Sequence, residues 1–175
     1  VAASLLLGFC WLLHAAGASG QAKSYYQLKV YRLDNPSQVE RVDNYLKNAY
    51  VPAAHRAGIR QVGVFRTLDT DTAGVRMYVL TPFSSLASLE KLTNTIDKDP
   101  AYQSAGTDYI NAAYDNVPYA RIETIILQAF PAAPMLNKPD LSAPAAERIY
   151  ELRSYQGPTE KYHASKLKMF TLGGE

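Results

Sequence analysis

The chain has 175 residues, which is enough for one domain with a substantial hydrophobic core and some residues to spare. Its charge is nearly balanced, with 18 lysines and arginines against 16 aspartates and glutamates, and it contains no arginine-rich run. The charge pattern therefore excludes a nucleic-acid partner from our expectations.

The first 22 residues have the composition of an export signal. Residues 1–22 contain no Asp, Glu, Lys or Arg, and an almost wholly apolar stretch to Leu13 is followed by small residues that offer A-x-A cleavage sites. We expect an N-terminally incomplete signal peptide in residues 1–22 and a mature protein exported to the periplasm or the extracellular medium. A membrane anchor is the alternative, but the apolar run is short for a span. Membrane contact is therefore expected only during export.

The lone cysteine of the chain, Cys10, falls inside this leader. A mature chain would then have no disulfide, no thiol nucleophile and no thiolate metal ligand.

The next stretch predicts a strand followed by a helix. Residues 25–32 alternate, and we expect Tyr26, Leu28 and Val30 to meet the helices while the residues between them face away. Asp34, Asn35 and Pro36 then mark a helix start, with a capping side chain before a proline in the first turn. The predicted buried stripe of this helix is Val39, Val42, Leu46 and Ala49. Pro52 should kink or end the helix, and Gly58 suits its C-terminal stop.

A hairpin, a second helical region and a fourth strand follow. Residues 61–68 and 75–81 read as strands joined by a polar turn. Ser84 is the expected cap of a helix that Asp99 and Pro100 interrupt and that resumes to about residue 115. The predicted buried stripe of its first part is Leu86, Leu89, Leu92 and Ile96. Residues 121–130 form a long strand rich in β-branched side chains.

The order strand, helix, strand, strand, helix, strand predicts an α+β, ferredoxin-like βαββαβ domain over residues 23–130, with both helices on one face of an antiparallel sheet. Residues 131–146 carry four prolines and read as a linker. The segment Tyr26-Gln-Leu-Lys-Val-Tyr31 recurs as Tyr150-Glu-Leu-Arg-Ser-Tyr155, each residue 124 positions later. This repeat predicts that residues 147–175 are the truncated start of a second, tandem copy, with a strand at 148–155 and a helix from Glu160 to about Phe170.

Several motifs, taken in order, resemble an exported bacterial protein of the NIPSNAP family. They are the segments 26–31 (YQLKVY), 57–65 (AGIRQVGVF), 99–103 (DPAYQ) and 118–123 (PYARIE). The resemblance covers residues 25–130, with 148–175 as a shortened second copy. It implies a fold of the dimeric α/β-barrel group, in which two ferredoxin-like sheets pack face to face, from two chains or from tandem halves. For this family it implies binding or trafficking roles and no established catalytic residues.

The sheet face turned away from the helices is where we expect chemistry. Alternation places Lys29 and Tyr31 on it, and Arg76 and Tyr78 share one parity on the third strand. The expected ligand-binding residues are Lys29, Tyr31, Arg76, Tyr78 and Glu123, with Arg153 and Tyr155 from the second copy. Such a basic, tyrosine-lined cavity would take a small anionic or aromatic ligand. The alternative, which we favour, is a paired polar network that closes the barrel.

No catalytic signature is found: there is no G-x-S-x-G elbow, phosphate-binding loop or dinucleotide fingerprint. His55 and His163 lack the spacing of a metal pair, so we expect no metal and no cofactor. Thirteen tyrosines against five phenylalanines is a bias that we attribute to packing, with an assembly surface as the alternative. We expect a protein that binds a small ligand or assembles sheet to sheet. A barrel oxygenase acting on an aromatic or quinone-like substrate, with or without haem, is the alternative.

Overall fold

The structure is a computed structural model, and it describes residues 24–68, 71, 74–137, 140–144 and 147–173. The predicted signal peptide lies outside the described residues. Among the residues that are described, no helix is long and apolar enough to cross a membrane.

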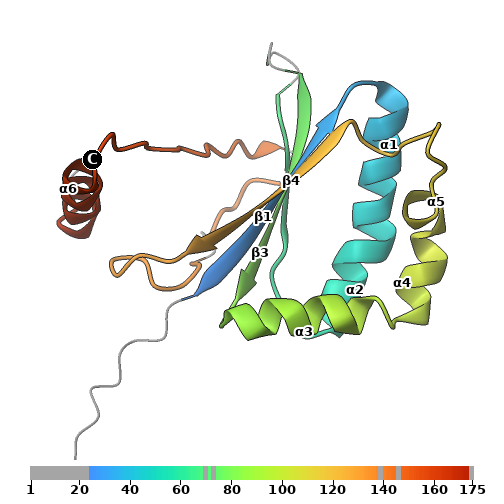
Figure 1. Ribbon diagram of the computed structural model, residues 1–175, viewed down its shortest axis with the longest axis horizontal. Coiled ribbons are helices and arrows are strands. Elements are labelled where there is room, and N and C mark those ends of the chain that lie inside the picture. The colour runs from blue at the N-terminus through green and yellow to red at the C-terminus, as the bar shows by residue number, and fades with distance from the viewer. Residues whose placement is uncertain (1–23, 69–70, 72–73, 138–139, 145–146, 174–175) are drawn as a thin grey trace, which may run out of the picture.

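The core of the molecule is one four-stranded antiparallel sheet. Its strands are β1 (Tyr25–Leu33), β2 (Gly63–Arg66), β3 (Val75–Phe83) and β4 (Arg121–Gln128), in the spatial order β2-β3-β1-β4. Helices α1 to α5 all cover one face, which we call the helix face, whereas α6 lies on the other side of the sheet (Figure 1). We call that other side the open face. The strand and helix order and the antiparallel pairing agree with the predicted βαββαβ unit.

The register of β1 decides which side chains meet the helices. Tyr31 lies opposite Met77 of β3 and Ile122 of β4, and Lys29 lies opposite Val79 and Thr124. Directly opposed residues share a face. Since Tyr31, Met77 and Val79 are each 2% exposed or less and belong to the helix-packed core, the odd-numbered residues of β1 face the helices. The predicted alternation is therefore wrong by one residue: Tyr26, Leu28 and Val30 lie on the open face.

The first helical stretch starts as predicted and crosses Pro52 without breaking. Asn35 caps α1 (Pro36–Tyr45), η1 (Leu46–Tyr50) is a π-helix, and α2 (Val51–Arg56) follows directly. A proline lacks the N–H for an α-helical bond, and its ring crowds the carbonyl four residues earlier. The wider turn before Pro52, in which the Val51 N–H donates to the Leu46 carbonyl, accommodates the ring. Gly58, with a φ of +94°, follows the end of α2.

The second helical region is divided into three pieces: α3 (Leu86–Ile96), α4 (Pro100–Ala105) and α5 (Thr107–Ile110). Its cap is Ser85 rather than the predicted Ser84, and Leu86 is 55% exposed because it stands in the first turn, so the predicted stripe is wrong at that residue. Helical structure ends at Ile110, earlier than expected. The break falls at Gly106, where a Cβ would lie 3.3 Å from the Cβ of Ala49 and closer still to Ile110. The missing side chain lets α4 and α5 approach η1.

The segment predicted to begin a second copy contains a helix but no strand. α6 (Glu160–Thr171) agrees with the predicted helix. Thr159 is its cap, and Gly173, at a φ of +74°, lies just beyond its end. Residues 148–155 are not a strand, which corrects the prediction for that segment. β1 is held by hydrogen bonds to β3 and β4 on both sides, whereas 148–155 has no neighbouring strand among the described residues.

We predict that Asn35→Ala lowers the free energy of unfolding by about 1 kcal/mol. The Asn35 side-chain oxygen accepts a hydrogen bond of 2.9 Å from the Gln38 N–H, and alanine leaves that donor without this partner. Urea denaturation followed by circular dichroism measures the change. Asn44→Ala, at an exposed position inside α1, is the control and should cause no loss. Equal destabilisation by both changes would contradict the capping role.

Candidate functional site

The residues predicted to share one ligand site are divided between the two faces of the sheet. Lys29 and Tyr31 lie on the helix face, whereas Arg76, Tyr78 and Glu123 lie on the open face, because Tyr78 and Glu123 are both opposite Val30. The expected convergence of Lys29 and Tyr31 with Arg76 is therefore wrong. The prediction fails because the alternation of β1 is reversed. Both faces of this strand carry apolar residues, and Tyr31 packs as an apolar residue on the helix face.

The open face is organised in rows that run across the strands. One row joins Arg76, Arg32 and Arg121, since Arg32 is opposite both other arginines. The next row contains Phe65, Tyr78, Val30 and Glu123. The row beyond it contains Gly63, Leu80, Leu28 and Ile125. A basic end therefore borders an apolar middle on this face.

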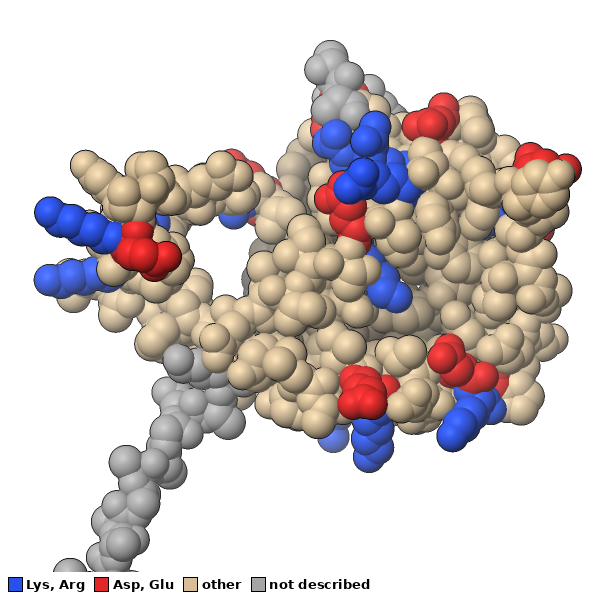
Figure 2. Space-filling view, viewed as in Figure 1, with Lys and Arg blue, Asp and Glu red and all other residues tan. Residues whose placement is uncertain are grey.

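The charged row is partly neutralised from within. The Arg121 Nε lies 2.9 Å from an oxygen of Glu123, and both side chains are exposed. Figure 2 shows Lys and Arg side chains gathered with acidic ones at the upper end of the sheet in that view. Sequence analysis missed Arg32 and Arg121. The signal that would have found them is their parity with Arg76 once the helix-facing set of β1 is assigned correctly.

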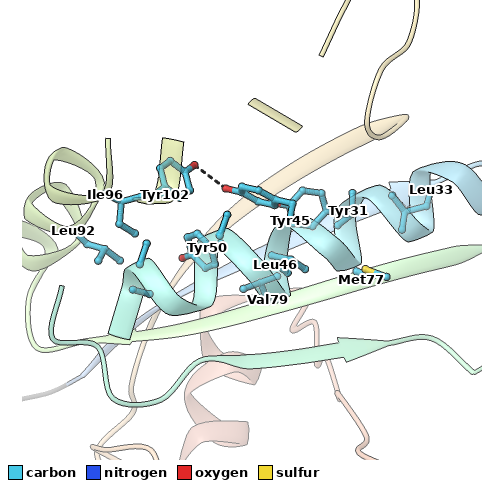
Figure 3. Packing of buried hydrophobic residues seen from close by; sticks show 14 of the residues in the cluster. Tyr31, Leu33, Tyr45, Leu46, Tyr50, Met77, Val79, Leu92, Ile96 and Tyr102 are labelled. Carbon is cyan, nitrogen blue, oxygen red and sulfur yellow. Dashed lines mark hydrogen bonds between the residues drawn. The ribbon is translucent and has the colours of Figure 1, made fainter. Parts of the chain in front are cut away.

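The helix face holds a group of tyrosines that we call the tyrosine cluster: Tyr31, Tyr45, Tyr50, Tyr102, Tyr109 and Tyr119. The rings of Tyr45 and Tyr109 stack with centroids 3.7 Å apart. The Tyr45 and Tyr102 hydroxyls form a hydrogen bond of 2.9 Å, shown as a dashed line in Figure 3. Tyr102, Tyr109 and Tyr119 thus pack into the fold as we favoured, whereas Tyr114 is 94% exposed.

Burial changes the acidity of this cluster. It raises the pKa of Tyr31 to about 12, and it also raises the pKa of Tyr45, Tyr50, Tyr102 and Tyr109. Each hydroxyl of these residues has a partner hydroxyl, such as Thr81 Oγ1 for Tyr50 at 3.2 Å. These hydroxyl pairs therefore form a neutral network on the helix face, which shares Tyr31 with the predicted polar set, whereas Arg76, Tyr78 and Glu123 of that set lie on the open face.

Lys29 is a cation on the helix face, as is Arg66, which lies opposite Met77. The Lys29 Nζ lies 5.2 Å from the centre of the Tyr50 ring, a cation–π distance. Burial lowers the pKa of Lys29, and the charge of Asp97 partly opposes that shift. Lys29 thus belongs to the tyrosine cluster and is separated by the sheet from Arg76.

The segment predicted to begin a second copy places two of its tyrosines as β1 places theirs. Tyr155, the counterpart of Tyr31, packs on α6 with its ring 5.4 Å from that of Phe170. Tyr150, the counterpart of Tyr26, contacts Phe65 on the open face of the sheet, with ring centroids 5.1 Å apart. Arg153 is paired with Glu151 at 2.9 Å. The predicted site residues Arg153 and Tyr155 therefore meet their own segment and helix rather than Arg76.

A hollow of about 710 Å³ lies elsewhere, at the start of α1, and is lined by Asp34, Glu40, Asp43 and Arg66 with apolar residues. None of the predicted site residues lines it. No group of His, Cys, Asp and Glu that could hold a metal ion occurs among the described residues.

No protein-family model and no curated protein matches the chain. Solved structures do share its fold. A NIPSNAP family protein with unknown function from Agrobacterium tumefaciens is 15% identical at a TM-score of 0.52, covering 67% of this chain and 97% of that protein. An uncharacterized NIPSNAP-like domain protein from Burkholderia xenovorans is 14% identical at a TM-score of 0.50, covering 66% and 93%. At such identities the likeness shows the fold, and it confirms the ferredoxin-like α+β class.

We predict that the protein loses stability steeply above pH 10 and that Tyr45→Phe makes this loss shallower. Tyrosines in the unfolded chain ionise near pH 10, whereas the buried ones stay protonated, Tyr31 to about pH 12. The folded state then binds more protons, so the free energy of unfolding falls as pH rises, by up to about 1.4 kcal/mol per pH unit for each such tyrosine. Urea denaturation between pH 8 and 11.5 gives the slope.

The matched control is Tyr114→Phe, at an exposed ring. It should leave both the stability at pH 8 and the alkaline slope as in the wild type, whereas Tyr45→Phe also costs about 1 kcal/mol at pH 8 through the lost hydroxyl pair. A wild-type stability that stays flat up to pH 11.5 would overturn the protonation argument.

Proposed function

We propose that this chain is a NIPSNAP-like module for binding and assembly, in which the open face of its sheet packs against a second sheet to form an α/β barrel. The fold shared with the two NIPSNAP structures supports the family, and the sequence motifs agree with it. We further propose that residues 1–22 are a signal peptide and that 147–175 begin the second unit. We do not propose the oxygenase alternative, because we can assign a catalytic role to none of the described residues.

The observation that carries the proposal is the apolar character of the open face. Ile125 is 41% exposed and Leu127 is 40% exposed, and both stand beside Leu28 and Tyr26 of β1. Large side chains of this kind on a broad sheet face mark a surface that another layer covers. The helix face, by contrast, is covered by α1 to α5 along β1 and β3, where Tyr31, Met77 and Val79 are 2% exposed or less.

A second observation concerns the order of layers. α6 lies on the side of the sheet opposite to α1–α5, with residues 148–155 between α6 and the sheet at Phe65 (Figure 1). Tyr155 points to α6 and Tyr150 to the sheet. α6 thus stands on the side of the sheet where the helices of a second, face-to-face unit would lie, which supports the proposal.

We predict that the chain from residue 23 onward self-associates through the open face and that Ile125→Asp weakens this association at least tenfold. A charge in an apolar sheet interface is unpaired and poorly solvated there. Sedimentation velocity over a range of protein concentrations measures the effect. Ile126→Asp is the control, because Ile126 is the next residue, is 46% exposed and lies on the opposite face. Monomeric behaviour of the wild type at high concentration would sink this prediction.

We also predict that the contact between the two copies forms within one chain. Cysteines placed at Phe65 and Tyr150, in a background with Cys10→Ser, should be joined by a short bismaleimide into a product of monomer mass. The reason is the 5.1 Å between the two rings. A control pair at Phe65 and Tyr114 should not be joined. A linked product of dimer mass would instead place the contact between two chains.

A further inference from the structure

We propose that the basic row of the open face is a binding site for an organic oxyanion with an apolar body, held by Arg32 and Arg76. The proposal rests on the proposed function, because the second sheet would cover this face. It names a ligand class and a place for it, and it replaces the predicted site that combined Lys29 and Tyr31 with Arg76.

The register of β1 with its two neighbouring strands brings three arginines together. Arg32 lies directly opposite Arg76 on one side and Arg121 on the other, so three adjacent strands present guanidinium groups in one line. Like charges directly opposite each other on one face destabilise a sheet unless an opposite charge compensates them. The row therefore calls for negative charge.

Negative charge is present at one end of this row. Glu123 pairs with Arg121, at the β4 end of the row. Within the part of the chain that the structure describes, neither Arg32 nor Arg76 has an ion pair or side-chain hydrogen bond. Arg76 is half-buried, so its charge is less well solvated than a fully exposed one.

Residues 148–156, which would begin the second copy, do not supply the missing negative charge. By the repeat, the residues of that segment that correspond to the open-face set of β1 are Tyr150, Leu152, Ser154 and Gln156, and none is acidic. Its acidic residue, Glu151, is paired with Arg153. A bound anion would therefore serve as the partner of the unpaired guanidinium groups of Arg32 and Arg76.

The neighbouring row defines the rest of the ligand. Beside the arginines lies the partly exposed ring of Tyr78, next to the buried Val30 and to Phe65, which packs against Tyr150, so an apolar ligand body would extend along Tyr78. Guanidinium groups bind carboxylates and phosphates in a two-pronged geometry. Glu123 stands at the far end of the apolar row and would repel a second negative charge on the ligand body. The ligand class is an aromatic or aliphatic acid with a single oxyanion head.

Equilibrium dialysis of the full chain against 2-naphthoate, 2-naphthyl phosphate and the neutral 2-acetylnaphthalene tests this. We expect both anions to bind, the neutral ketone to bind at least tenfold more weakly, and the ratio of the two anions to show whether a carboxylate or a phosphate head fits. Arg32→Met and Arg76→Met should each weaken naphthoate binding roughly tenfold or more. Arg76→Lys, which keeps the charge and loses the two-pronged geometry, should fall between.

Arg60→Met is the matched control, since it removes the same charge from an exposed position between α2 and β2. The site is overturned if naphthoate fails to bind the wild type at millimolar concentration, if the ketone binds equally well, or if Arg60→Met weakens binding as much as Arg76→Met. Circular dichroism checks that each variant is folded. If the Phe65–Tyr150 link forms while naphthoate does not bind, the oxyanion site falls and the proposed packing stands. If neither is observed, both fall.

Discussion

The register of the central strand β1 is the constraint on which the rest of the structure depends. β1 is paired along its length with β3 on one side and β4 on the other, and these pairings place Tyr31 opposite Met77 and Ile122. A shift by one residue would exchange the two faces. Tyr31, buried to 2% exposure, would then leave the tyrosine cluster, and Val30 would replace it with a much smaller side chain. The helix-side hydroxyl network and the open-face arginine row both follow from this one choice.

Local signals in the sequence located the strands and most of the helix boundaries of residues 25–128, but not the faces of the sheet. Asn35 with Pro36, Gly58, and the Asp99–Pro100 pair each act on the residues beside them, and each marks a helix boundary in the structure. Alternation decides a face only when one side is apolar and the other polar. β1 has Leu28 and Val30 on one side and Tyr31 and Leu33 on the other, since both faces of its sheet carry apolar side chains. A tyrosine counted as polar, together with Lys29, was then enough to reverse the assignment.

The strand and the helix predicted for residues 148–170 show the same distinction between local and distant bonds. α6 forms because its hydrogen bonds and its Thr159 cap lie within the segment itself. Residues 148–155 repeat the sequence of β1 but have no strand beside them among the described residues, and the bonds of a strand come from its neighbours. The side chains still keep the order of β1, since Tyr155 meets α6 and Tyr150 meets the sheet. These two tyrosines thus contact different elements although the segment that carries them has no backbone pairing with a strand.

The polar and charged groups on the two faces of the sheet differ in whether they have partners, and this difference connects packing with binding. On the helix face, hydroxyl pairs satisfy the tyrosines and the ring of Tyr50 faces the ammonium group of Lys29. On the open face, Arg32 and Arg76 stand side by side next to apolar residues. Covering this face with a second sheet removes water from those guanidinium groups, which is costly while they are unpaired. An anion that pairs with them removes that cost, so anion binding and sheet packing favour each other by the same free energy. In this protein, packing of the second sheet would then raise the affinity for the anion, and the bound anion would raise the affinity for the second sheet.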